Sequence, residues 1–231
     1  MRFVELSHVI HGGAVTYPGL PAPVVESWRS HEASRAHYEP GTEFHIGRID
    51  MVANTGTYID APFHRYRDGA DVADLGLETV ADLECVVARA EAAREIGPAL
   101  FRDLELAGRA LLVHTGWSAR WGNASYFTGH PFLTEQAGRL LVGARVALVG
   151  IDSLNIDRTD GGARPVHSAL LAAGIPIIEH MRGLEELPDR GARLFAVPPR
   201  VRGLGSFPVR AFAILPDVAE PTRRAHRPSS S

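Results

Sequence analysis

The chain of 231 residues contains one cysteine, no long apolar run and no excess of basic residues. The single cysteine, Cys85, cannot form an internal disulfide, and a lone cysteine is typical of a reducing compartment. Because it begins the apolar run CVVARA, we expect a buried thiol in a strand rather than a nucleophile. No stretch approaches the ~20 apolar residues of a membrane span, and the N-terminus lacks the apolar run of a signal peptide. These absences favour a cytoplasmic protein without a membrane partner.

The charge balance excludes another class of partner. The net charge is −3 and the isoelectric point is about 6.4, so the chain lacks the basic surface of a nucleic-acid-binding protein. The hydrophobic fraction of 45% is ordinary for a globular protein, and the length suits a single α/β domain. We assign residues 1–218 to this domain and expect the polar tail at 219–231 to be disordered.

Hydrophobic patterning predicts strands that alternate with helices. Buried strands are expected at 110–114 and 145–151, each followed by a polar residue. A proline near the first turn favours a helix over 131–141, and Gly174 is a natural cap for a helix over 167–173. Further strands are expected at 3–6, 44–52, 85–87, 175–178, 194–197 and 209–215, with a short helix at 98–106.

Polar residues occur where expected strands end, and ligands of open α/β sheets bind beyond strand ends. Asp60, His167 and Glu179 together offer two carboxylates and one imidazole, a plausible set for a divalent cation such as zinc or manganese. His64 follows Asp60 by four residues and is a candidate acid or base near the same centre.

Each of these residues also has a purely structural interpretation. His167 is suited to capping a helix or filling the core, and Asp60 to an Asx turn before Pro62. Glu179 is suited to a surface ion pair with Arg182, a contact worth little. From the chemistry of the residues alone, the site hypothesis and the structural interpretation stay open.

Two motifs resemble those of a known family. Residues 54–64 read NTGTYIDAPFH, similar to the signature His-x-Gly-Thr-His-x-Asp-x-Pro-x-His of the cyclase superfamily of metal-dependent hydrolases. This superfamily includes bacterial kynurenine formamidase and isatin hydrolase. Its second signature, a histidine, an apolar helix, Gly-Ile-Pro and a glutamate, is similar to residues 167–179. Shorter similar pieces occur near 5–10, 17–19, 114–117, 149–157 and 206–211.

The resemblance implies a fold, an activity and an assembly. The fold expected from it is a swivelling β/α/β domain with a mixed, barrel-like central sheet flanked by helices. The activity is hydrolysis of an amide or lactam by a metal-activated water, with the histidine that matches His64 as the proton shuttle. The assembly is a homodimer or homotetramer, and the partner is a small-molecule substrate.

The sequence departs from the family pattern at two positions. Two metal-binding histidines of the family are Asn54 and Tyr58 here, whereas Asp60, His167 and Glu179 retain the complete second ligand set. An asparagine carbonyl is a poor zinc ligand but acceptable to harder cations, and a tyrosine hydroxyl is a good hydrogen-bond donor.

Three hypotheses follow from these departures. The first is hydrolysis with one divalent metal, to which Asn54 is a possible further ligand. The second is metal-free acid–base chemistry, such as dehydration, isomerisation or ring closure, carried by Tyr58 and His64. The third is a non-catalytic protein that only binds a small ligand.

Tyr17 and Trp28 are expected to line the substrate pocket, because aromatic side chains offer stacking area and a polar edge. The identity of the substrate is not encoded in any motif.

Overall fold

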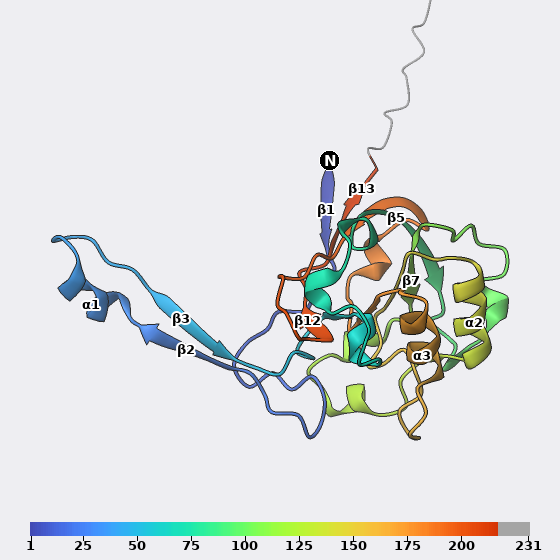
Figure 1. The fold of residues 1–231 in the computed structure, drawn as a ribbon, viewed down its shortest axis with the longest axis horizontal. Coiled ribbons are helices and arrows are strands. Elements are labelled where there is room, and N and C mark those ends of the chain that lie inside the picture. The colour runs from blue at the N-terminus through green and yellow to red at the C-terminus, as the bar shows by residue number, and fades with distance from the viewer. Residues whose placement is uncertain (217–231) are drawn as a thin grey trace, which may run out of the picture.

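A curled mixed sheet of nine strands forms the centre of the computed structural model, which describes residues 1–216 (Figure 1). The order of its strands is β1-β13-β11-β5-β7-β9-β10-β4-β12. Their bounds are β1 (Arg2–Glu5), β4 (Tyr58–Asp60), β5 (Ala81–Arg89), β7 (Ala110–His114), β9 (Leu148–Ile151), β10 (Ile177–Glu179), β11 (Arg190–Phe195), β12 (Ser206–Pro208) and β13 (Phe212–Leu215). The expected α/β fold class is confirmed. The tail at 219–231 lies outside the described residues.

The middle of the sheet is parallel and buried on both faces. Strands β5, β7, β9 and β10 pair in parallel, and all five residues of β7 are buried. Successive residues of β5 join different cores, Cys85 and Val87 on one face and Val86 on the other. Helices α2 (Glu135–Gly143) and α3 (Pro165–Ala172) cover the second face, where Leu141 and Leu170 are fully buried. Continuous apolar runs of this kind are typical of parallel strands with helices packed against them.

Two expected helices differ from the structure. The helix expected over 98–106 is wrong beyond its first turn, a 3-10 helix at Pro98–Leu100, because Phe101 and Leu106 turn into the core as irregular chain. The helix expected over 131–141 begins only at Glu135. Phe132–Leu133 (β8) instead pairs with Glu95–Ile96 (β6), and the Thr134 hydroxyl then caps α2 by accepting from the Ala137 amide at 3.3 Å.

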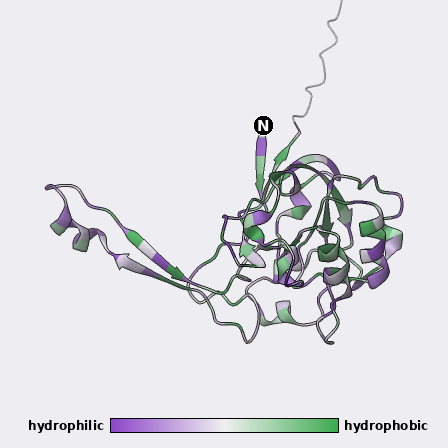
Figure 2. Ribbon diagram, viewed as in Figure 1, coloured by the Kyte–Doolittle hydropathy of each residue, from purple (hydrophilic) through white to green (hydrophobic). Residues whose placement is uncertain are grey.

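A long hairpin projects from this body and was not expected from the sequence. Strands β2 (Val24–Arg29) and β3 (Ile46–Asp50) pair only with each other, and the tip carries the short helix α1 (His31–Ser34) (Figure 1). Figure 2 shows hydrophobic residues along β3 although the hairpin stands away from the core. At least 43% of each of these large apolar side chains is exposed: Val24, Val25, Trp28, Tyr38, Phe44, Ile46 and Ile49. We call residues 24–50 the hairpin arm.

The helices of the described residues are all too short or too polar to cross a membrane.

The environment of Cys85 leads to a first prediction. The side chain is fully buried in β5, as the sequence indicated, and burial raises the pKa of its thiol to about 12. Because the thiolate is the reactive form, iodoacetamide will not label the native protein at pH 8 but will label it once per chain in denaturant. Mass spectrometry measures both states, and rapid labelling of the native protein would contradict this placement.

Candidate functional site

Three adjacent strands, β10, β4 and β12, carry the polar side chains of the site. In the antiparallel register, Glu179 lies opposite Tyr58, and both Ile177 and Ser206 lie opposite Asp60. Since side chains alternate along a strand, Tyr58 and Asp60 share one face, while Ile59 between them enters the opposite core. Tyr58, Asp60 and Glu179 are all buried. The sequence-expected residues from two distant segments are therefore neighbours in the sheet.

His167 joins this group from the first turn of α3 and is held there by Asp157. The Asp157 carboxylate accepts from the backbone amides of Val166 and His167, each at 2.9 Å, and from the imidazole Nδ1 at 2.7 Å. The Nδ1–H of His167 is thus committed to Asp157. Its Nε2 faces the other carboxylates, 3.6 Å from Asp60 Oδ2 and 3.5 Å from Glu179 Oε1.

The charge around His167 is strongly negative. Burial lowers the pKa of its imidazole, but the charge of Glu179 and the neighbouring Asp157 and Asp60 outweigh burial and raise the pKa to about 10. For Glu179, burial has the opposite effect and raises the pKa of the carboxyl to about 7, although the nearby His167 acts to lower it. The cluster therefore attracts a positive charge, supplied either by a protonated His167 or by a cation.

Asp60 has one satisfied oxygen and one orphan. Its Oδ1 accepts from the Ser206 hydroxyl, whereas Oδ2 is buried without any hydrogen-bond partner among the described residues. A buried, unpaired carboxylate oxygen is costly unless a ligand completes it. The orphan oxygen points to the place where a cation would be held.

Ser206 links three of the candidate residues. Its Oγ accepts from the Asn54 side-chain amide at 3.2 Å and lies 2.9 Å from Nδ1 of His64. Because this hydroxyl donates its own proton to Asp60, His64 must donate from Nδ1, which leaves its Nε2 as a proton acceptor.

The chain brings His64 to this position through a tight backbone approach. Pro62 begins the 3-10 helix Pro62–His64 directly after β4. Gly205 packs so closely on this turn that an added Cβ would lie 2.4 Å from the His64 Cα. Only glycine fits there, and the contact fixes the turn against β12.

Glu179 is enclosed by hydrogen-bond donors. Its Oε1 accepts from the Ile156 amide at 2.6 Å, and its Oε2 accepts from the Tyr58 hydroxyl at 2.6 Å. The Asn155 amide reaches Oε2 at 3.3 Å and also donates to the Tyr17 hydroxyl at 2.9 Å. Burial, followed by the charge of Glu179, raises the pKa of Tyr58 well above its usual value. Tyr58 therefore stays protonated and serves as a donor.

The donor set fits a divalent cation. Among residues 1–216, one potential metal-ligating atom from each of Asp60, His64 and His167 lies within 4.8 Å of the other two. Glu179 Oε1 lies beside His167 Nε2. Imidazole nitrogen and carboxylate oxygen together suit zinc or manganese. In this grouping His64 lies beside the ligand set Asp60, His167 and Glu179 that the sequence suggested. The metal itself stays a prediction.

A cavity of about 310 Å³ opens over this cluster. Asn54, Tyr58, His64, His167, Glu179 and Tyr17 line it, so seven of the eight residues expected from the sequence, Asp60 included, gather at one place. Trp28 does not: it is 65% exposed on β2 of the hairpin arm and lies outside the cavity of its own chain. Its expected position is corrected, because the arm carries it away from the body.

Sequence reasoning missed four residues of the site. Ser206, Asp157 and Asn155 bind the expected residues by hydrogen bonds, and no spacing rule joins them to Asp60 or Glu179 across the chain. Fully buried His180 follows Glu179 with a positive φ of 56° and packs against the rings of Tyr17 and Tyr58. The segment 149–157 resembled the family, and this was the one available signal for Asp157.

The hydrogen bonds of Asp157 lead to a second prediction. Asp157→Asn removes the charge that holds the start of α3 and the His167 ring, and we expect a loss of about 2–3 kcal/mol in the free energy of unfolding. Urea titration measures it. Asp160→Asn is the matched control, because Asp160 forms only surface ion pairs with Arg158 and Arg94 and should change stability by less than about 1 kcal/mol. Equal losses in both variants would contradict the role of Asp157.

The chain is similar to known proteins over most of its length. Kynurenine formamidase of Bacillus cytotoxicus is 29% identical over 212 residues, which cover 91% of this chain and 96% of that protein. The Bacillus cereus kynurenine formamidase is 28% identical over 213 residues, with the same coverage.

Solved structures share the fold. One described as a potential metal-dependent hydrolase with cyclase activity superposes with a TM-score of 0.76 at 25% identity, covering 92% of this chain and 96% of that one. Isatin hydrolase A from Ralstonia solanacearum superposes with a TM-score of 0.81 at 24% identity over 93% of this chain and 92% of that one. The model of the family described as Putative cyclase matches residues 4–158, and the chain belongs to that family.

Proposed function

We propose that this protein is a hydrolase of carbon–nitrogen bonds other than peptide bonds, acting on a small amide or lactam with the help of one divalent cation. The observation that carries the proposal is the convergence of Asp60 Oδ2, His167 Nε2 and Glu179 Oε1 under a cavity open to a substrate. The relatives named kynurenine formamidase and the family membership support the same reaction class.

The cation would be held by Asp60, His167 and Glu179, with His64 at the edge of the set. A divalent cation there supplies Lewis-acid activation of a carbonyl and of water at neutral pH. The hydrogen bond from His167 to Asp157 fixes the imidazole with Nε2 free, an arrangement that supports metal ligands elsewhere in proteins.

One cation is favoured over two. The Tyr58 hydroxyl occupies Glu179 Oε2, an oxygen that a second cation would need. At position 54, where the family pattern has a histidine, the Asn54 amide donates a hydrogen bond to Ser206. Two neutral hydrogen-bond donors therefore stand where the family has two metal ligands. The remaining ligand atoms suffice for a single ion.

His64 is the best candidate for moving the proton. Its side chain is 36% exposed, whereas Asp60, His167 and Glu179 are buried, so only His64 exchanges protons readily with solvent. Its Nε2 is the free acceptor, because Nδ1 is committed to Ser206. In the proposed reaction His64 takes a proton from the attacking water and returns it to the departing amine.

The metal-free alternative finds less support. It requires Tyr58 to exchange its proton, but this hydroxyl is buried, donates to Glu179 and has a pKa raised well above the usual value. A phenol that holds its proton so firmly is a poor general base and a weak acid. It is better suited to hold Glu179 in place.

Metal removal gives the third prediction. Hydrolysis of N-formylkynurenine and isatin by the purified protein should fall at least about 100-fold after dialysis against a chelator and return with one equivalent of zinc or manganese per chain. Elemental analysis gives the stoichiometry. Turnover that survives with no bound metal and is lost in Tyr58→Phe would favour acid–base chemistry, and ligand binding without turnover would favour a non-catalytic protein.

The same assay tests His64. His64→Ala should lower kcat by about 10²–10⁴ while the protein remains folded, whereas His11→Ala, an exposed histidine outside the cavity, should leave kcat unchanged.

We also propose that the chain assembles as a homodimer or homotetramer through the hairpin arm. A two-stranded hairpin without a packing partner is marginally stable in water, and exposed apolar clusters mark interaction surfaces. Several charges of the arm pair internally, Arg48 with Glu26 and Arg35 with Glu43, so the apolar side chains are what it offers to a second copy. Trp28 then contributes to a substrate pocket only if it reaches the cavity of that copy.

Light scattering tests the assembly. The native protein should have a mass that is a multiple of 25.0 kDa, and Trp28→Glu should reduce it toward one chain, since the charge would be buried at the interface. Leu77→Glu, at an equally exposed apolar residue of the body, should not change the mass. A native protein that is monomeric at micromolar concentration would overturn the proposal.

A further inference from the structure

Two arginine side chains line the cavity of the candidate site without a carboxylate partner. Arg65 and Arg164 both contribute to its wall, and neither forms an ion pair within residues 1–216. Surface arginines nearby are paired differently, as Arg158 is with Asp160. An arginine on the wall of a ligand cavity, free of a protein carboxylate, is suited to recognise an anionic group of a ligand.

Each guanidinium is anchored on one side only. Arg65 donates from Nε to the Ser168 hydroxyl at 3.2 Å. Arg164 donates from one terminal nitrogen to the carbonyls of Arg158, Gly161 and Ala163, at 3.1, 2.7 and 2.8 Å. The remaining nitrogens donate no hydrogen bond to a described residue, and the Arg65 guanidinium also lies 5.3 Å from the centroid of the Tyr66 ring. Anchoring of this kind orders a side chain in advance and leaves its other donors for a planar anion such as a carboxylate.

The arginines have a fixed relation to the reactive centre. Arg65 follows His64 directly, and Arg164 caps the start of α3, three residues before His167. Asp60 and Glu179 lie together beside Nε2 of His167, and their negative charge would repel an anion. A ligand with one carboxylate would therefore enter with that group toward the arginines and its neutral carbonyl toward the histidines.

Part of the cavity wall suits a small ring. Tyr17 and Leu20 line the cavity with aromatic and aliphatic surface, and its volume of about 310 Å³ is at the small end of ligand pockets. The cavity wall thus combines cationic, apolar and candidate reactive side chains.

We propose that Arg65 and Arg164 bind a carboxylate of the substrate, so that the preferred substrates are small aromatic amides or lactams that carry a separate carboxylate. The selectivity rests on the proposed hydrolase function, since it names the substrate class of the same site. The recognition itself does not depend on turnover.

A matched pair of substrates tests the selectivity. Hydrolysis of 2-formamidobenzoate and of its neutral analogue 2-formamidobenzamide is compared in the wild type, Arg65→Gln, Arg164→Gln and the double variant. We expect the double variant to raise KM for the carboxylate substrate at least about tenfold, with little change in kcat and no change for the neutral amide. Equal effects on both substrates, or none on either, would overturn the proposal.

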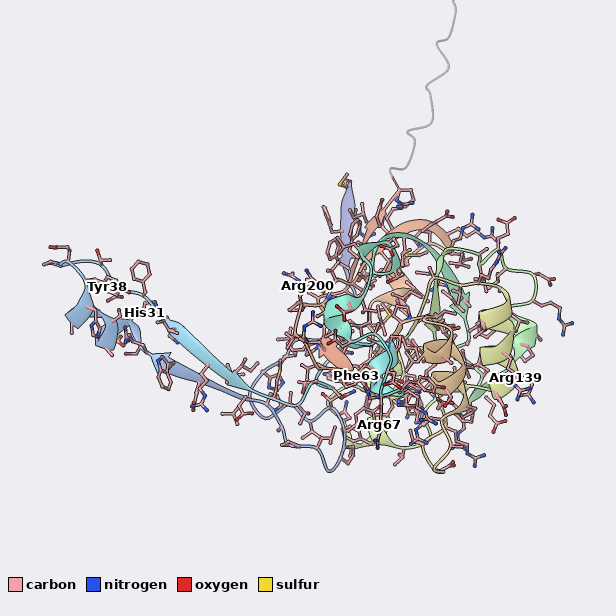
Figure 3. All side chains as sticks on the ribbon, in the orientation of Figure 1. His31, Tyr38, Phe63, Arg67, Arg139 and Arg200 are labelled. Atoms are coloured by element: carbon pink, nitrogen blue, oxygen red, sulfur yellow. The ribbon has the colours of Figure 1, made fainter. Side chains whose placement is uncertain are left out.

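The control variant is Arg67→Gln. It removes the same charge two residues from Arg65 and at a similarly exposed surface position (Figure 3), but Arg67 does not line the cavity. It should leave both KM values unchanged. If it raises KM for the carboxylate as strongly as Arg65→Gln does, general electrostatic attraction explains the preference and the two cavity arginines do not.

Binding without turnover separates failure of this proposal from failure of the hydrolase function. Calorimetry compares 2-aminobenzoate with 2-aminobenzamide on chelator-treated full-length protein, which removes direct binding of the carboxylate to a metal. The wild type should bind the carboxylate at least about tenfold more tightly than the amide, and the double variant should lose the preference. Absence of a preference in the wild type would overturn the proposal, whatever the protein hydrolyses.

Discussion

The hydrogen bonding of three buried carboxylates around one imidazole is the constraint on which the rest of the site depends. Asp60, Asp157 and Glu179 are each removed from water, and an uncompensated buried carboxylate would cost several kcal/mol. Backbone amides, hydroxyls and His167 satisfy all of their described oxygens except Asp60 Oδ2. The fold thus gives every one of these carboxylate oxygens a hydrogen-bond donor except Asp60 Oδ2, and the proposed cation would bind at that oxygen.

The sheet supplies most of this compensation by register. Strand β4 lies between β10 and β12, so Tyr58 meets Glu179 on one side while Asp60 meets Ser206 on the other. A shift of one residue would turn Tyr58 and Asp60 into the apolar core and bring Ile59 to the cavity. The apolar packing of Ile59 and Ile178 therefore stabilises the arrangement of the candidate site as well as the fold.

The sequence was sufficient to locate the centre but not to complete it. Asp60, His64, His167 and Glu179 could be proposed because their residue types and local motifs carry a chemical meaning. Ser206 and Asn155 could not, since serine and asparagine are common and their contacts depend on which strands pair. Strands β4 and β12 have three residues each, too few to show a periodicity. The buried runs of β7 and β9 were recognisable for the opposite reason, because continuous apolar segments are distinctive.

The hairpin arm was missed because its pattern conflicts with its environment. Its strands contain apolar residues, which in a single chain would predict burial, yet every residue of β3 is exposed. Local sequence cannot distinguish a strand that packs on its own core from one that projects toward another molecule. The position expected for Trp28 in its own chain was wrong for the same reason, since an aromatic side chain alone does not indicate where the arm extends.

Asn54 and Tyr58 change what the site can hold without moving it. An imidazole at these positions would offer a lone pair to a metal, whereas the Tyr58 hydroxyl and the Asn54 amide donate protons, to Glu179 and to Ser206. Both residues thus donate hydrogen bonds to retained residues, where a histidine would offer a lone pair to a metal. The Ser206 hydroxyl accepts from Asn54 and also contacts His64, the proposed proton carrier, so one hydroxyl connects these two residues. A histidine restored at either position alone would have to displace one of these bonds before it gained a metal, so the two departures belong to one network.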